Sequence, residues 1–163
     1  MSPTVFHSLV SASPAETTAL AHGMAGVLRP GDVLLLDGPI GAGKTHFARS
    51  LIRAVQGPGS DEDIPSPTFT LVQTYDSPKG EIWHADLYRL TNPGEVPELG
   101  LEDAFETAIC LVEWPDRLGS AQPHAALTLR FVTKGDDTRE IAFSGAGDWA
   151  ARLSPALHPT GAA

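Results

Sequence analysis

The sequence predicts one α/β domain, a three-layer sandwich with a mainly parallel central sheet and antiparallel C-terminal strands. Three features support this: a buried strand leading through a glycine-rich turn into an amphipathic helix, a later continuous apolar strand, and an alternating strand pair near the end. Strands buried on both faces are typical of parallel sheets covered by helices. The 163 residues suffice for one well-buried domain. We expect residues 1–156 to form it and residues 157–163 to be a flexible tail.

The first third of the chain predicts a helix, a strand and a second helix. Ser13 and Glu16 have the spacing of a capping box at the start of a helix over residues 14–28. Residues 33–36 are a short continuous apolar run, as expected of a buried parallel strand. After the glycine-rich turn, apolar residues recur at helical spacing until Gly57 ends the helix.

The remaining two thirds predict strands joined by turns, with one short helix. Residues 57–65 combine turn-forming residues with acids and are interpreted as a solvated loop. The expected elements are a hairpin of strands over 70–75 and 81–86, a helix over 101–106, a strand over 108–114, and a closing antiparallel pair over 125–132 and 139–143.

Composition excludes several classes of protein. The net charge of −9 argues against direct binding of nucleic acid, because contacts to phosphate need clustered Lys and Arg. The same charge suits solubility, or docking onto a basic surface of a partner. No apolar run is long enough to span a membrane and the N-terminus lacks a secretory pattern, so we expect a cytoplasmic protein. The single cysteine, Cys110, leaves no intrachain disulfide and is expected to be buried.

One motif carries the chemistry. Residues 38–45, Gly-Pro-Ile-Gly-Ala-Gly-Lys-Thr, match the phosphate-binding pattern G-x-x-x-x-G-K-[ST] between a strand and a helix. The glycines let backbone N–H groups point at phosphate oxygens, and the helix adds its positive N-terminal end. An incidental glycine-rich turn would not require that flanking strand and helix. The motif therefore predicts a P-loop NTPase-like fold that binds ATP and Mg²⁺ through Gly38, Gly41, Ala42, Gly43, Lys44, Thr45 and His46.

Within this loop, Lys44 is expected to reach the β- and γ-phosphates and the Thr45 hydroxyl to ligate Mg²⁺. An acidic group at the end of a nearby strand must complete the metal site. Glu113 ends a uniformly apolar strand and is the favoured direct ligand, whereas Asp86 ends a less apolar strand and is favoured for positioning the attacking water. Either residue could instead be a plain acid at a strand end.

Hydrolysis is expected to proceed by in-line attack of water on the γ-phosphate, with Lys44, Asp86 and Glu113 as catalytic residues. Residues 66–70, Ser-Pro-Thr-Phe-Thr, could contribute the Ser66 and Thr68 hydroxyls to the γ-phosphate as a nucleotide-sensitive switch. A plain turn is an equally good interpretation of that segment.

The histidines do not predict a metal site, because no pair among the six has metal-site spacing. His84 and His46 are therefore interpreted as packing or surface residues. Trp114 directly follows Glu113 and is interpreted as a core residue or a wall of the site.

Together, the blocks GPIGAGKT, SPTFTLVQTY, HADLYRL, ELGLEDAF and LVEWPDRLG resemble the TsaE family of bacterial P-loop ATPases. The resemblance covers roughly Ser11 to Glu140. The loop alone occurs in many NTPases, but the DLYR and VEWP blocks at these distances are distinctive. The resemblance implies an ATPase that works with the partner proteins TsaB and TsaD, which transfer a threonylcarbamoyl group to adenosine 37 of tRNAs reading ANN codons. It implies contact with tRNA only indirectly, and hydrolysis that supports repeated turnover of the partner complex.

The resemblance also implies that Lys44 contacts phosphate, Thr45 and Glu113 contact Mg²⁺, Asp86 lies beside the attacking water, and residues 66–70 form a nucleotide-sensitive loop. The chain departs from the family pattern in two places: the family usually has Asp-Leu at residues 39 and 40, and a Thr at residue 46.

The departures bear on affinity more than on fold. Pro39 removes one N–H donor. It lies early in the loop, so we expect the phosphate nest from Gly41 onward to survive. His46 can still offer its backbone N–H to the α-phosphate.

Two other functions remain open at this point. A small-molecule kinase would share the loop, but it would need a basic lid, and the 11 Lys and Arg residues are scattered without an Arg-rich segment. A nucleotide-dependent interaction module would use ATP binding alone, with incidental hydrolysis. Because the chain shows no arginine finger of its own, hydrolysis in isolation is expected to be slow.

Overall fold

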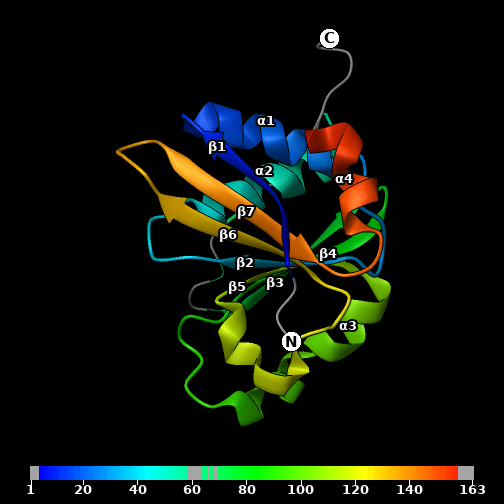
Figure 1. Cartoon of the computed structure of the whole chain (residues 1–163). Helices are drawn as coiled ribbons and strands as arrows, with labels where there is room; N and C mark the ends of the chain where they lie inside the picture. The colour runs from blue at the N-terminus through cyan, green and yellow to red at the C-terminus, as the bar shows by residue number, and fades with distance from the viewer. Residues whose placement is uncertain (1–3, 59–63, 66, 68–69, 158–163) are drawn as a thin grey trace.

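The computed structural model describes residues 4–58, 64, 65, 67 and 70–157 (Figure 1). The strands are β1 (Val5–Ser11), β2 (Val33–Asp37), β3 (Val72–Ser77), β4 (Gly80–Asp86), β5 (Ile109–Glu113), β6 (Leu127–Thr133) and β7 (Arg139–Gly145). The α-helices are α1 (Pro14–Ala25), α2 (Lys44–Gln56), α3 (Leu101–Thr107) and α4 (Trp149–Leu157), and two 3-10 helices are η1 (Pro93–Leu99) and η2 (Pro115–Ala121).

All described strands belong to one seven-stranded sheet with the order β1-β7-β6-β2-β5-β4-β3. The four central strands β6, β2, β5 and β4 are parallel, while β1, β7 and β3 pair antiparallel with their neighbours. Helices α1, α2 and α4 cover one face of the sheet and α3 lies on the other (Figure 1). The predicted three-layer α/β class is confirmed, although antiparallel strands lie at both edges of the sheet and not only at the C-terminal end.

The two faces of the sheet carry separate hydrophobic cores. Leu34 and Leu36 of β2 pack toward α1 and α2, whereas Val33 and Leu35 pack toward α3. This explains why β2 and β5 are continuous apolar runs, since both faces of these central strands are covered. Cys110 of β5 is fully buried, as expected.

The first helix ends earlier than predicted, at Ala25 instead of residue 28. Gly26 caps it, and the N–H of Val27 donates to the Met24 carbonyl in a closing turn. The Lys79 ammonium, from the turn of the β3–β4 hairpin, donates to the carbonyls of Ala25 and Leu28 at 2.8 and 2.6 Å. The unsatisfied carbonyls at this helix end are thus met by a side chain from another element.

Strand β1, helix α4 and the two 3-10 helices were not predicted. β1 pairs with β7 at one edge of the sheet. α4 is fixed by Arg152, whose guanidinium donates to both carboxylate oxygens of Asp32 at 2.9 and 2.5 Å and lies over the Trp149 ring. The hydrogen bond to Asp32 raises the pKa of Arg152. α4 ends at Leu157, the first residue of the predicted tail, and the rest of that tail lies outside the described residues.

No described helix has the length and apolar character needed to cross a lipid bilayer.

Candidate functional site

The predicted phosphate-binding loop connects β2 to α2 at the carboxyl ends of the parallel strands. Its glycines Gly38, Gly41 and Gly43 have φ values of 143°, 80° and 99°. Positive φ is readily adopted only by glycine. At Gly38 a side chain is also excluded by space, because a Cβ there would lie 2.5 Å from the Phe131 carbonyl oxygen of β6. Three of the motif positions are therefore glycine for backbone reasons.

Both departures from the family pattern are accommodated locally. The Pro39 carbonyl accepts the N–H of Ala42 at 3.2 Å, so Pro39 opens a turn in which its own missing N–H is not used. His46 Nε2 lies 3.0 Å from both Thr18 Oγ1 and the Pro14 carbonyl, which ties α2 to α1. The His46 side chain is exposed, and its backbone lies in the first turn of α2, where N–H groups have no partner within the helix.

Lys44 is buried at the base of the loop. Its Nζ donates to the Gly38 carbonyl at 2.5 Å and lies 3.6 Å from the centre of the Trp114 ring. Trp114 has a left-handed backbone with φ of 59°, and it lines the same cavity as the lysine. Burial lowers the pKa of Lys44, and the nearby carboxylates of Glu113 and Asp86 oppose that shift. The Lys44 ammonium therefore lies in a pocket with carboxylates nearby. A bound phosphate would take the place of the Gly38 carbonyl and the Trp114 ring as its contact.

The two candidate acids lie side by side at the ends of adjacent strands. Asp86 of β4 is the register partner of Glu113 of β5. The Thr45 hydroxyl, from the first turn of α2, donates to Glu113 Oε1 at 2.7 Å. Asp86 Oδ1 accepts the Tyr88 N–H at 3.1 Å, which fixes its carboxylate at the start of the following segment. The structure thus brings Lys44, Thr45, Asp86 and Glu113 together from three separate parts of the chain.

These side chains surround a cavity of about 280 Å³, which we call the phosphate-side cavity. It is lined by Ile40, Gly41, Lys44, Thr45, Asp86, Tyr88, Glu113 and Trp114. The described residues contain no cluster of three or more His, Cys, Asp or Glu side chains that could hold a metal by themselves. A hydroxyl and a buried carboxylate at one wall do fit Mg²⁺, which commonly takes one or two protein oxygens and completes its shell with phosphates and water.

A second cavity, of about 230 Å³, lies on the α1 side of Gly43, and we call it the outer cavity. Its lining is Pro14, Thr17, Gly43, His46, Asp137 and Arg139. The loop and the start of α2 therefore separate two hollows, one lined by the acids and Lys44, the other by α1 and the β6–β7 turn. An elongated ligand with an anionic group at the loop could extend from one hollow toward the other.

Two residues contact the site although the sequence predicted no role there for either of them. His84 is fully buried, in agreement with packing, but its Nε2 also lies 2.7 Å from Glu113 Oε2. Arg139 of β7 donates from Nε to the Ala42 carbonyl and from Nη2 to the Gly41 carbonyl, both at 3.1 Å. The HADLYR block signalled that residue 84 is close to Asp86, but nothing local signals Arg139, since its contact depends on the strand order.

The predicted switch lies mostly outside the described residues, which include neither Ser66 nor Thr68. Its last residue, Thr70, is exposed. The following residue, Leu71, has a positive φ of 67°, and its carbonyl accepts the Asp86 N–H at 2.8 Å. The end of this segment is therefore bonded to the backbone of a candidate catalytic residue.

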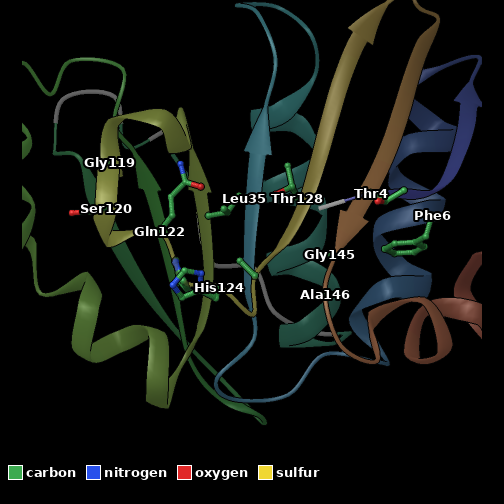
Figure 2. Close-up of a pocket in the computed structure, with 12 residues that line it drawn as sticks. Thr4, Phe6, Leu35, Gly119, Ser120, Gln122, His124, Thr128, Gly145 and Ala146 are labelled. Carbon is green, nitrogen blue, oxygen red and sulfur yellow. The ribbon is translucent and has the colours of Figure 1, made fainter. Parts of the chain in front are cut away.

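A larger cavity, of about 910 Å³, is not near the loop. It lies on the sheet face beside η2, where Leu35, Thr128 and His124 line it (Figure 2). This half of the face, over β6, β7 and β1, is left uncovered by α3 (Figure 1). No carboxylate, lysine or arginine lines this cavity among the described residues, so the chemistry is concentrated at the smaller cavities beside the loop.

Comparisons with known proteins identify the family of the chain and a solved structure with a similar fold. The family model described as "Threonylcarbamoyl adenosine biosynthesis protein TsaE" matches residues 11–141. A tRNA threonylcarbamoyladenosine biosynthesis protein TsaE from Rickettsia bellii is 39% identical over 127 residues, covering 78% of this chain and 87% of that protein. The protein of the same name from Bacillus subtilis is 37% identical over 137 residues, covering 83% and 84%. The crystal structure of Bacillus subtilis YdiB matches with a TM-score of 0.75 and 28% identity, covering 97% and 99% of the two chains.

Proposed function

The chain belongs to the TsaE family of threonylcarbamoyladenosine biosynthesis proteins, and from that premise we propose that it is the ATP-hydrolysing, Mg²⁺-dependent subunit of this tRNA-modification machinery. One observation carries the proposal. Lys44, Thr45, Asp86 and Glu113 line one cavity beside a glycine-rich loop, although they come from α2, β4 and β5.

The nucleotide is proposed to lie across the loop. Its β- and γ-phosphates would occupy the phosphate-side cavity, against Lys44 and the free N–H groups at the start of α2. The α-phosphate would meet the backbone N–H of His46. The base would extend into the outer cavity, between the start of α1 and the β6–β7 turn. Ser66 and Thr68 would add hydroxyls from the adjoining segment when nucleotide is bound.

Each side chain has a distinct role in hydrolysis. Lys44 would leave the Gly38 carbonyl and the Trp114 ring and follow the charge that develops on the γ-phosphate. Asp86 would orient the attacking water, since its carboxylate is held by the Tyr88 N–H and lines the same cavity. Thr45 and Glu113 would hold Mg²⁺, which when bound supplies charge neutralisation on the phosphate oxygens.

Hydrolysis by the isolated chain is proposed to be slow. No arginine lines the phosphate-side cavity among the described residues, and an arginine that reaches the transferred phosphate accounts for about 10³ to 10⁵ of the rate in related NTPases. Faster turnover would then require a partner. We propose that TsaB and TsaD stimulate hydrolysis in this way. tRNA would be contacted only through their complex, because the net charge of −9 disfavours direct binding of nucleic acid. We also propose that the protein acts in the cytoplasm and that residues 1–156 form a single domain.

Phosphate release tests the proposal when measured for the chain alone, with TsaB and TsaD, and with TsaB, TsaD and tRNA. We expect slow release alone and stimulation in the complex. Lys44→Ala and Glu113→Gln should abolish the stimulated rate, and Arg53→Ala on the exposed side of α2 should preserve it. Phosphate transfer to a metabolite would indicate a kinase. Wild-type support of tRNA modification by Glu113→Gln, without hydrolysis, would indicate an interaction module.

A further inference from the structure

The carboxylate of Glu113 is held from two sides. Oε1 accepts the Thr45 hydroxyl and Oε2 lies 2.7 Å from His84 Nε2. Glu113 is only 2% exposed, so its charge depends on these donors and on nearby Lys44 rather than on bulk water. Two donors on two different oxygens fix the rotation of the carboxylate as well as its position.

His84 reaches this position from the strand register. It lies two residues before Asp86 in β4, so both side chains point to the same face of the sheet, toward α2. Its neighbours on that face, Ile82 of β4 and Leu111 of β5, belong to the hydrophobic core. The imidazole therefore lies between that core and the end of β5.

The hydrogen bonds assign the tautomer of His84. Nδ1 is buried without a hydrogen-bond partner among the described residues, whereas Nε2 faces a carboxylate. A buried lone pair is tolerated better than a buried N–H without an acceptor, so the proton belongs on Nε2. His84 then donates to Glu113 and makes no other polar side-chain contact within the described part of the chain.

Packing of the core does not by itself require a histidine at residue 84. A leucine would fill the same space in the core without an unsatisfied nitrogen, since a buried polar group costs free energy unless it is fully bonded. We propose that His84 is a positioning residue: its Nε2–H holds Glu113 Oε2 inward and so presents Oε1, together with the Thr45 hydroxyl, to Mg²⁺. A carboxylate restrained in this way offers one oxygen, which suits the small octahedral shell of Mg²⁺.

The inference rests on the proposed function and is tested by Mn²⁺ binding, which does not require turnover. Electron paramagnetic resonance measures Mn²⁺ affinity of the full chain saturated with a nonhydrolysable ATP analogue. His84→Phe and His84→Met remove the donor, and we expect each to weaken Mn²⁺ affinity by about tenfold to a hundredfold. Affinity for the analogue in EDTA should stay within about threefold, because the loop contacts to phosphate are untouched. His84→Gln, which can donate from a similar position, should restore most of the Mn²⁺ affinity.

Ile82→Ala is the matched control, because Ile82 is equally buried on the same strand and face but is the register partner of Ile109, four residues before Glu113. It should lower the unfolding temperature and leave Mn²⁺ affinity unchanged. Three results would overturn the inference: unchanged Mn²⁺ affinity in both donor-free variants, an equal loss of affinity in Ile82→Ala, or failure of both donor-free variants to fold. In each of these cases, Mn²⁺ binding by the wild-type protein would still uphold the proposed function. A wild-type protein that binds no Mn²⁺ with the analogue would overturn the proposed function itself.

Discussion

Arg139 should control how well the free loop is organised for nucleotide. Its guanidinium donates to the carbonyls of Gly41 and Ala42, and also to the carbonyls of Gly135, Asp136 and Thr138 in the β6–β7 turn. Carbonyls that bond to Arg139 point away from the phosphate site, which leaves loop N–H groups free to point into it. We therefore expect Arg139→Met to weaken nucleotide binding without removing any phosphate contact.

The size of the effect follows from the two bonds to the loop. The bond to Ala42 is partly buried and the bond to Gly41 is exposed. A hydrogen bond to a charged group contributes about 1.5 kcal/mol or more when buried, and an exposed charge interaction about 0 to 1 kcal/mol. Together the two bonds stabilise the organised loop by about 2 kcal/mol. In the variant, the binding free energy of the nucleotide would be reduced by that amount. This corresponds to a rise in Kd of at most about 30-fold.

Titration calorimetry with ADP or a nonhydrolysable ATP analogue measures this rise. Arg53→Met, on the exposed side of α2, carries the same change of net charge and should bind within about twofold of wild type. Arg139→Lys separates charge from geometry, since lysine keeps the charge but cannot reproduce the forked contacts. We expect it to lose at least half of the free energy lost by Arg139→Met. If Arg139→Lys binds like wild type while Arg139→Met does not, the effect is electrostatic and this reasoning is refuted.

Other parts of the fold give independent expectations. Lys79→Met should lower the free energy of unfolding in urea by about 1 to 3 kcal/mol, because its ammonium donates to two carbonyls at the end of α1; exposed Lys134→Met should change it little. Burial raises the pKa of Cys110 to about 12, so at pH 8 the thiol should react with a disulfide reagent only as the chain unfolds, and rapid reaction of the native protein would contradict its burial. Burial lowers the pKa of Lys44, and bound phosphate should raise it again, so binding takes up a proton at alkaline pH and affinity falls as pH rises through the lowered pKa. Calorimetry in buffers of different ionisation enthalpy measures that uptake, which should vanish at pH values well below the lowered pKa of Lys44.

The sequence predicted the local parts of this molecule well. The loop between β2 and α2, the β3–β4 hairpin and the β6–β7 pair each depend on residues close together in the chain, where turn formers and apolar periodicity act directly. Strand β1 was not predicted because it is an edge strand with mixed exposure that pairs with β7, the last strand of the chain. α4 was not predicted because it is short and contains Pro155, and because a distant ion pair with Asp32 fixes it.

The same distinction applies to the candidate site. Lys44, Thr45, Asp86 and Glu113 could be selected from the sequence, because a motif or the end of a strand marks each of them. The contacts of Arg139 and His84 could not, because they depend on which strands are neighbours and on which face each side chain points. The strand register decides to which face of the sheet each side chain points. A slip of one residue in β4 would turn both His84 and Asp86 away from α2.

The site also explains why the domain buries charge where an apolar core would be more stable. Lys44, Asp86 and Glu113 are each at most 6% exposed, and His84 is fully buried. Burying ionised groups lowers stability unless they are paired and hydrogen-bonded. Here each is held by a fixed partner in the free protein: Gly38 for Lys44, the Tyr88 N–H for Asp86, and Thr45 with His84 for Glu113. These bonds limit the loss of stability. For Asp86 and Glu113 they also set the orientation of the carboxylate before a ligand arrives, which is the arrangement that stabilises developing charge with little reorganisation. Lys44 differs, because it would exchange its two partners for phosphate.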